Sequence, residues 1–514
     1  MIIDTSVNNK RIAKNTLLLY ARMMFLMLIS LYTSRIVLKT LGISDFGIYN
    51  IVGGLVVFFT FLNNAMVSSI QRFLNYEMGQ AHIDKVKDVF SMSINCQLLI
   101  ILLVVILSES IGLWFLNSYI NIPKDRIVAA NWVYQFSVLS ICIGILYSPY
   151  NASIIAYERM SVYAYIGLIE ATLKLLLVFL LTFWKYDKLV MYTFLLFVVN
   201  LIVCSIYIYY CHKKIHTCKY YFIKDKMLFK KLMSFSGWSL FGSGASIGTA
   251  QGINIIINIF FGVKLNAAMG VANQVNAAIN NFLSNFVMAY QPQIVKAYAS
   301  KNFSYFQNLI FNTTKLSYYL LFVFSFPLII SCNEILHLWL VNVPNYAVSL
   351  TRLILIFSLI ESIGTPLWIS VQAVGKIKIY QIVISCINLF NIPLGIIFFL
   401  LGTSPESIII IRIITNIFCQ IFRVQYLHRI FPFKIKDYIK LSVIPCFIVT
   451  CVSIPIPLFI KYVTSCYWGG GVLTIIASFF IALTCIWILG LSKQEKIHII
   501  NSINNKIKLY INKV

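Results

Sequence analysis

Charged residues interrupt several long apolar runs of this sequence, and their types predict ligand binding. Arg22 lies about two helical turns into the first apolar run. Glu170 and Lys174 are four residues apart in a later run, on one helix face, so Lys174 either binds a ligand or neutralises Glu170. Glu361 lies deep in another run. Such charges are costly in hydrocarbon, so the cations predict an anion-binding site. Burial raises a carboxyl pKa, so Glu170 and Glu361 are candidates for coupling to H⁺ or Na⁺.

Four further basic residues lie within the apolar runs or near their ends and are also candidates for a substrate cavity. Arg35, Arg352 and Arg412 lie near the ends of their runs, where a long side chain can either reach the membrane interface or face a cavity. The sequence leaves both interpretations open. Lys315, inside a further run, is another candidate cation of a substrate cavity.

Uncharged polar side chains recur at spacings of three and four within the middle of the chain. A helix would gather them on one face, which hydrocarbon does not tolerate. The face either makes helix–helix hydrogen bonds or lines a wet cavity that suits sugars. The candidate cavity residues are Gln251, Asn254, Asn273, Asn276 and Asn280, together with Asn63 and Asn64 of an earlier run.

The elements that position these residues must be membrane helices. The chain has 514 residues, of which 60% are hydrophobic and 11% charged. A soluble domain has about 25% charged residues, and a span needs about 20 apolar ones. The composition therefore excludes a soluble enzyme and a secreted disulfide scaffold, and predicts an all-α polytopic protein with about fourteen spans. We expect them at 15–37, 47–70, 89–114, 127–148, 161–184, 187–211, 232–260, 265–290, 307–330, 347–370, 378–401, 407–427, 438–460 and 470–490.

The net charge of +25 follows the expected loops. With the N-terminus inside, basic residues favour the cytoplasmic side by about four to one, which predicts cytoplasmic termini. No nucleic-acid motif or nucleotide-binding loop is present. Cys211, His212, His216 and Cys218 match no standard zinc spacing, so we predict neither a metal site nor a resident cofactor.

The chain divides at its longest polar stretch. The sequence predicts an N-terminal bundle at 1–211, a basic cytoplasmic linker at 212–231, a second bundle at 232–430, and two additional spans with a basic tail at 431–514.

The two predicted bundles repeat each other. A shift of 220 places Gly42 on Gly262, and a shift of 217 places Ser148-Pro149 on Thr365-Pro366 and Tyr163 on Tyr380. Six helices separate the copies, so both face the same way, and a pseudo-two-fold axis would run along the membrane normal. Such repeats are typical of transporters that work by alternating access.

Three features together resemble a known family: the repeat, an arginine low in the first span, and the phrase Leu41-Gly42-Ile43-Ser44-Asp45-Phe46-Gly47-Ile48-Tyr49, followed by Gln71-Arg72. They are similar to the polysaccharide flippases of the multidrug/oligosaccharidyl-lipid/polysaccharide exporter superfamily, and most of all to the O-antigen and capsule repeat-unit flippases. The resemblance implies a MATE-like fold and the transfer of undecaprenyl-pyrophosphate-linked oligosaccharide across the bacterial inner membrane.

The resemblance also implies roles and partners. Arg22 matches the cavity arginine of the family's first helix, whereas Asn63 and Asn64 occupy the region of its second-helix arginine. The cations would attract the pyrophosphate, and the polyprenyl tail would stay in membrane lipid. A polysaccharide polymerase and chain-length machinery are the expected protein partners.

Two other functions remain open. An ion-coupled multidrug exporter of the same superfamily should have an acidic cavity, whereas basic residues outnumber Glu170 and Glu361 within the predicted spans. A membrane glycan polymerase or ligase should have a large outer loop with catalytic residues. The longest predicted outer segments, near 115–126 and 331–346, are short and lack paired carboxylates.

Overall fold

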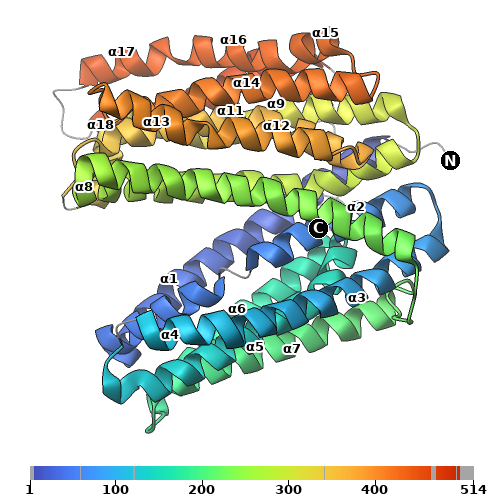
Figure 1. Cartoon of the computed structure of the whole chain (residues 1–514). Helices are drawn as coiled ribbons and strands as arrows, with labels where there is room; N and C mark the ends of the chain where they lie inside the picture. Colours follow the sequence, from blue (N-terminus) through green and yellow to red (C-terminus); the bar gives the residue numbers. More distant parts are fainter. Residues whose placement is uncertain are drawn as a thin grey trace, which may run out of the picture. The chain divides into compact units, whose positions relative to one another are not determined.

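The computed structural model describes residues 5–57, 60–119, 122–340, 342–464, 470–493 and 495–497, and within these ranges it contains helices and no strand. Its first helices are α1 (Thr5–Val57), α2 (Thr60–Gly79), α3 (Ile83–Leu107), α4 (Leu113–Tyr119), α5 (Ile127–Ala156), α6 (Met160–Phe183) and α7 (Lys188–Lys214). The later ones are α8 (Lys226–Ala299), α9 (Phe303–Ile330), α10 (Cys332–Trp339), α11 (Ala347–Val374), α12 (Lys378–Leu389), α13 (Asn391–Leu400), α14 (Ser407–Ile430), α15 (Ile435–Tyr438), α16 (Ile444–Ser453), α17 (Pro455–Thr464) and α18 (Gly470–Cys485). Figure 1 labels most of them.

Eleven helical segments of the described chain are long and apolar enough to cross a membrane. They are Ile83–Ser118, Lys124–Ala156, Met160–Phe183, Lys188–Lys214, Lys226–Gly262, Phe303–Ile330, Ala347–Val374, Lys378–Leu400, Ser407–Ile430, Ile435–Val463 and Gly471–Gly490. Each overlaps one span expected from the sequence. The other expected spans, 15–37, 47–70 and 265–290, fall in α1, α2 and the second part of α8, which are helical where described but are not among the eleven. The prediction of an all-α, multi-pass membrane fold is confirmed.

The chain forms two compact units. We call Ala13–Gly244 with Tyr298–Lys301 the N-unit, and Met1–Ile12, Ala245–Ala297 and Asn302–Val514 the C-unit. In the N-unit, α5 packs along α7, and α2 packs against α3 and α5. In the C-unit, α11 packs between α9 and α14 (Figure 1). The chain passes from one unit to the other inside α1, twice inside α8 and once more just before α9. The boundaries expected from composition, with a linker at 212–231, remain predictions.

Backbone conformation repeats with the offsets found in the sequence. Gly42 and Gly262, 220 residues apart, each interrupt a helix with φ of 80° and 75°. Ala81 and Lys301, also 220 apart, have φ of 59° and 58°. Glu158 and Gly375, 217 apart, both have positive φ too. Positive φ is uncommon outside glycine, so these matched positions reflect a repeated chain path.

Candidate functional site

A cavity of about 380 Å³ lies within the C-unit, between α11 and the second part of α8. It brings together one carboxylate with amide and hydroxyl side chains, which is a lining suited to a small polar or cationic ligand. Its walls are Asn276, Asn280, Leu283, Ser284, Val287, Phe357, Ser358, Glu361, Ser362 and Thr365. Among the predicted site residues, Asn276, Asn280 and Glu361 are thus brought together.

Three polar side chains of the cavity form one hydrogen-bonded group. Asn280 Nδ2 donates to Asn276 Oδ1 at 2.9 Å, and Ser358 Oγ donates to the same oxygen at 2.6 Å. Helical spacing places both asparagines on one face of α8, and Ser358 meets them from α11. Asn276 and Asn280 therefore join two helices and also line this cavity, so these two residues have both of the features that the sequence left open.

Glu361 carries the charge of this cavity and is itself paired. Its Oε1 accepts a hydrogen bond from Arg423 Nη2 of α14 at 2.8 Å, and its side chain is 41% exposed while that of Arg423 is 8% exposed. Gly364 leaves room for the guanidinium, because a Cβ at that position would collide with it. Arg412 lies over the ring of Phe357, 4.5 Å from its centroid, and interacts electrostatically with Glu361. The carboxylate of Glu361 is thus bonded to Arg423, lies in the electrostatic field of Arg412, and is open to the cavity on its remaining side.

Arg22 has a different environment in the N-unit. Its guanidinium lies over the ring of Tyr163 at 4.3 Å and against the backbone of Gly167, where any larger residue would overlap it. Nε is buried without a hydrogen bond, and Arg22 makes no ion pair within the described ranges. A cation held by an aromatic face and left without a carboxylate keeps its charge available for an anion.

Glu170 and Lys174 neutralise each other on α6. Lys174 Nζ donates to Glu170 Oε1 at 2.6 Å, and both side chains are partly exposed. Tyr147 and Tyr207 stack nearby with ring centroids 5.0 Å apart, and both interact electrostatically with Glu170. The i, i+4 pairing foreseen as one alternative is therefore formed, and it leaves less free charge here than at Arg22.

A buried amide connects three helices of the N-unit. Gln97 of α3 is fully buried, and its Nε2 donates to Asn63 Oδ1 at 3.2 Å and to Ser148 Oγ at 2.5 Å. Asn64 is exposed on the same helix as Asn63. Ser148 belongs to the repeated Ser/Thr-Pro pair, and its counterpart Thr365 lines the C-unit cavity. Gln97 lacks a charge or a motif, so the sequence analysis missed it.

The remaining predicted residues lie elsewhere. Lys315 is buried and pairs with Glu495 at 2.7 Å, away from the cavity lining. On α8, Asn254 Nδ2 donates to Gln251 Oε1 at 3.4 Å, and Asn273 is exposed. Arg352 Nε donates to the Ile329 carbonyl. The side chain of Arg35 lies outside the part that the structure describes.

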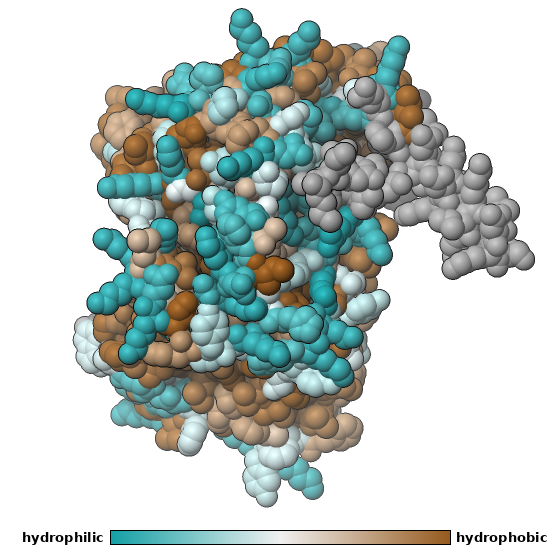
Figure 2. All heavy atoms as spheres, turned by 90° about the vertical axis from the view of Figure 1, so that its right-hand side faces the viewer, coloured by the Kyte–Doolittle hydropathy of each residue, from teal (hydrophilic) through white to brown (hydrophobic). Residues whose placement is uncertain are grey.

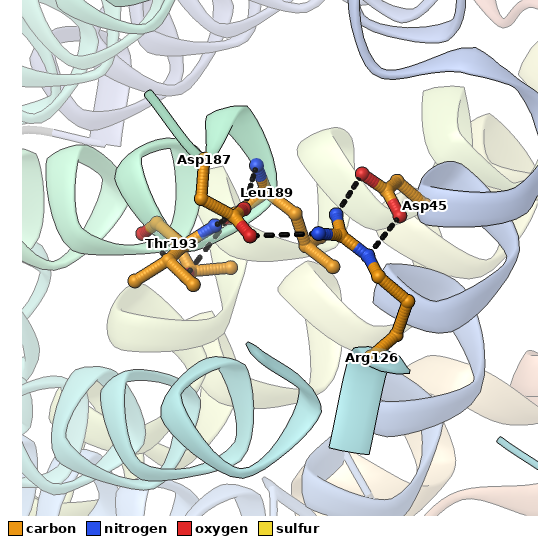
Figure 3. A network of polar contacts seen from close by, with 6 residues as sticks. Asp45, Arg126, Asp187, Leu189 and Thr193 are labelled. Carbon is orange, nitrogen blue, oxygen red and sulfur yellow. Dashed lines mark hydrogen bonds and ion pairs between the residues drawn. The ribbon is translucent and has the colours of Figure 1, made fainter. Parts of the chain in front are cut away.

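Figure 3 shows an ion-pair network of the N-unit that the sequence did not predict. Arg126 donates to both carboxylate oxygens of Asp45, and its Nη1 donates to Asp187 Oδ2 at 2.8 Å. Asp187 also caps α7 by accepting from the backbone nitrogens of Leu189 and Val190. Asp45 belongs to the 41–49 phrase, so this phrase is tied to two other segments of the same unit.

The sequence also did not lead to Arg423 and Gly167 as site residues, although the position of each in its apolar run was a weak indication. Arg423 lies inside the expected span 407–427, but the charge count assigned it to a cytoplasmic loop. Gly167 lies about one helical turn before Glu170 in an apolar run. Each gains its role from a partner distant in sequence, which spacing cannot reveal. The four residues Cys211, His212, His216 and Cys218 form no metal-ligating cluster in the structure.

Comparison with known proteins identifies the fold. No protein-family model matches the chain. No curated protein matches it either. Among solved structures, an outward-facing multidrug resistance MATE family transporter of the MOP superfamily aligns with a TM-score of 0.71 at 11% identity, covering 82% of this chain and 96% of the other. A MATE in the bent conformation gives a TM-score of 0.70 at 12% identity with the same coverages.

A third similar structure is a MOP superfamily transporter from Pyrococcus furiosus, described as having a binding pocket of reverse polarity that suggests a different function. It gives a TM-score of 0.66 at 11% identity, over 82% of this chain and 96% of that one. The chain therefore has a MATE-like fold, as expected.

Proposed function

We propose that this chain is a flippase that moves undecaprenyl-pyrophosphate-linked oligosaccharide repeat units across the bacterial inner membrane by alternating access. Its product would feed O-antigen, capsule or exopolysaccharide synthesis. Both termini would be cytoplasmic, and a polysaccharide polymerase with its chain-length machinery would take up the product. The MATE-like fold supports transport in general, and the choice of substrate is argued from the charged side chains.

Arg22 is the observation that carries this proposal. A pyrophosphate cannot enter hydrocarbon without losing its hydration, and a fixed positive charge offsets that cost. Three other cations of the predicted spans are paired with carboxylates: Lys174 with Glu170, Lys315 with Glu495 and Arg423 with Glu361. Arg22 rests on Tyr163 without a carboxylate among the described residues. The resulting surplus of positive charge favours an anionic substrate over a cationic drug.

Ion coupling is the second part of the proposal. Glu361 is more exposed than its partner Arg423 and opens into a cavity that also presents Asn276 and Ser358. A carboxylate with amide and hydroxyl oxygens can accept H⁺ or bind Na⁺. When the ion binds to Glu361 in place of Arg423, the guanidinium would be released from the carboxylate. Glu170, paired within its own helix, is the second candidate.

The same cavity is the observation that favours an alternative function. A carboxylate facing a cavity can also attract an organic cation, and one similar structure is a multidrug resistance transporter. A neighbour with a pocket of reverse polarity indicates that this fold accommodates pockets of more than one polarity. An ion-coupled multidrug exporter is therefore the second candidate, and a transporter of either kind is favoured over a glycan polymerase or ligase.

The test compares a bacterial host that lacks the chain with the same host supplied with the full chain or with a variant of it. We expect loss of the chain to cause accumulation of undecaprenyl-linked sugar inside the cell, with dye efflux unchanged. Arg22→Ala should reproduce the accumulation, and Arg22→Lys should restore part of the export. Glu361→Gln should also impair export. Loss of dye efflux without sugar accumulation would favour the exporter, and normal export by both Arg22→Ala and Glu361→Gln would refute the site.

A further inference from the structure

The segment between α7 and α8 is a structured strap, which we define as residues 215–225. Ile215, Thr217 and Cys218 are buried, and Thr217 Oγ1 is 2.8 Å from Tyr157 Oη. Cys211, the residue that ends the buried face of α7, is buried beside them. Residues 215–218 therefore fix the start of the strap against the N-unit, although composition alone predicts a polar linker.

The other end of the strap is bound to α3. Tyr221 N donates to Ser91 Oγ at 3.3 Å, and Asn95 Nδ2 donates to the Ile223 carbonyl at 3.3 Å. Tyr220 Oη donates to Asn95 Oδ1 at 2.9 Å. Tyr221 Oη donates to Asp88, and this hydrogen bond raises the pKa of the Tyr221 phenol to about 12, so it stays protonated. Four such contacts hold the strap in one position.

A cationic patch projects from this fixed strap and from the first turns of α8. We define it as Lys219, Lys224, Lys226, Lys230 and Lys231, all of which are exposed. Figure 2 shows hydrophilic side chains gathered on the end of the N-unit at which α7 runs into α8. None of the five lysines makes an ion pair inside the described part of the chain. The patch therefore presents uncompensated positive charge.

The acidic side chains around the patch have other partners. Asp225 caps α8 by accepting from the backbone nitrogens of Met227 and Leu228 at 2.8 and 3.0 Å. Asp88 accepts from Tyr221, and Asp84 pairs with Lys87 at 3.1 Å. The local carboxylates thus help to build the strap, and an external anion is needed to balance the lysines.

Apolar side chains stand among these lysines. Phe222 is 69% exposed and Met227 is 68% exposed, and Lys224 Nζ lies 5.5 Å from the Phe222 ring centroid. Exposed aromatic and apolar groups next to lysines are unfavourable in water but suit the boundary between headgroups and acyl chains. The patch lies where the spans Lys188–Lys214 and Lys226–Gly262 leave the membrane, on the side predicted to be cytoplasmic.

We propose that the strap and the cationic patch form a binding surface for anionic phospholipid headgroups of the cytoplasmic leaflet. Phosphate groups would contact the lysines, while Phe222 and Met227 would enter the upper acyl region. Positive charge opposite a negatively charged leaflet is complementary, and each lysine near such a surface strengthens binding several-fold. The surface is independent of the proposed substrate and would operate in any transporter built on this chain.

The test is native mass spectrometry of the full chain in detergent, titrated with phosphatidylglycerol and separately with phosphatidylcholine. We expect the wild type to prefer phosphatidylglycerol. The triple variant Lys219→Gln, Lys224→Gln, Lys230→Gln should bind phosphatidylglycerol about tenfold more weakly or worse. The matched variant Lys39→Gln, Lys124→Gln, Lys185→Gln removes the same charge from exposed positions on the predicted outer side and should keep the wild-type affinity.

Each other outcome counts against the proposal. Equal losses in the two triple variants would mean unspecific attraction by net charge. Unchanged binding in the strap variant would mean that the surface binds no lipid. Displacement of phosphatidylglycerol by inorganic pyrophosphate would assign the patch to free phosphate groups instead. Should the triple variant fail to fold, Lys230→Gln with Lys231→Gln, on exposed positions of α8 away from the strap's hydrogen bonds, must still weaken binding.

Discussion

Gly42 and Gly262 adopt the same backbone conformation 220 residues apart, with φ of 80° and 75° and ψ of 170° and −175°. This region of φ and ψ is accessible almost exclusively to glycine. Both residues divide what would otherwise be one continuous helix, so each turns the chain between two helical segments. Apart from the glycine itself and the adjoining backbone, no atom of the described residues lies within 4 Å of a Cβ built at either position, so the requirement for glycine comes from the backbone.

Alanine at these two positions should destabilise the protein. We expect Gly42→Ala and Gly262→Ala each to lower the free energy of unfolding by about 1–3 kcal/mol, because the native φ becomes strained. Thermal unfolding in detergent measures the effect. Gly47→Ala and Gly270→Ala are matched controls on the same helices, with ordinary φ and open space, and should be neutral or slightly stabilising. Equal losses at all four positions would contradict the explanation.

Gly167 should control the position of Arg22. A methyl group at residue 167 would overlap the guanidinium, which would have to leave the Tyr163 ring. We expect Gly167→Ala to reduce export by up to about 100-fold, because displacement of a functional group by about 1 Å can cost that much. Export of lipid-linked sugar measures the effect. Gly144→Ala, a helical glycine with open space, should export normally, and normal export by Gly167→Ala would separate Arg22 from function.

Removal of Glu361 should expose the cost of burying Arg423. Glu361→Gln leaves a guanidinium that is 8% exposed without its carboxylate, so we expect a loss of about 1–3 kcal/mol, moderated because Glu361 is 41% exposed. The double variant Glu361→Gln, Arg423→Gln should recover part of that stability while ion-coupled export stays impaired. Glu170→Gln is the control, because its partner Lys174 is 41% exposed and solvated. Additive losses in the double variant would rule out the coupling.

Asp187 has two separable functions. Asp187→Ser keeps an oxygen for the α7 cap but loses the ion pair with Arg126, whereas Asp187→Ala loses both (Figure 3). We expect the alanine variant to be less stable than the serine variant by about 1 kcal/mol, the usual value of a cap. Comparison of their unfolding midpoints measures the difference. Identical midpoints would mean that the cap contributes nothing.

Glu334 predicts a dependence of stability on pH. Burial opposes its charged form, but the hydrogen bond and charge of Lys461, 2.9 Å away, together with Arg352, lower the pKa of Glu334. The unfolded chain then binds the proton more readily, so the pair stabilises the folded state above the ordinary glutamate pKa of about 4.3, and this contribution is lost as pH falls through the lowered value.

Lys461→Gln measures this contribution. We expect the variant to be less stable than the wild type at neutral pH, and the difference between their unfolding midpoints to shrink as the solution is acidified. Lys39→Gln, which removes an exposed lysine of the N-unit, should show no such convergence. A difference that stays constant with pH would exclude the pair as its source.

The spans could be predicted because hydropathy and length are local properties. The expected 161–184 and 407–427 match Met160–Phe183 and Ser407–Ile430 to within a few residues. The glycine at 42 and its copy at 262 were also found by comparing the two halves of the sequence. The spans depend on neighbouring residues only, and the membrane imposes the same requirement on every span.

Apart from the pair of Lys174 and Glu170, the partners of the charged residues could not be predicted. Lys174 meets Glu170 because helix geometry brings i and i+4 together, and that pair was foreseen. Lys315 and Glu495 are 180 residues apart, and Arg423 and Glu361 are 62 apart, so packing alone selects them. Gln97 carries no charge and joins Asn63 to Ser148 only after three helices have assembled.

The direction of the strap's contacts bears on how the protein is made. Asp88, Ser91, Asn95 and Tyr157, which hold residues 215–225, all precede them in the chain. Translation proceeds from the N-terminus, and units that are complete early fold first. The ribosome has therefore already released every one of these partners when the strap emerges. Residues 215–225 can therefore join the end of α7 to α3 and to the turn after α5 while most of the second half is still being translated.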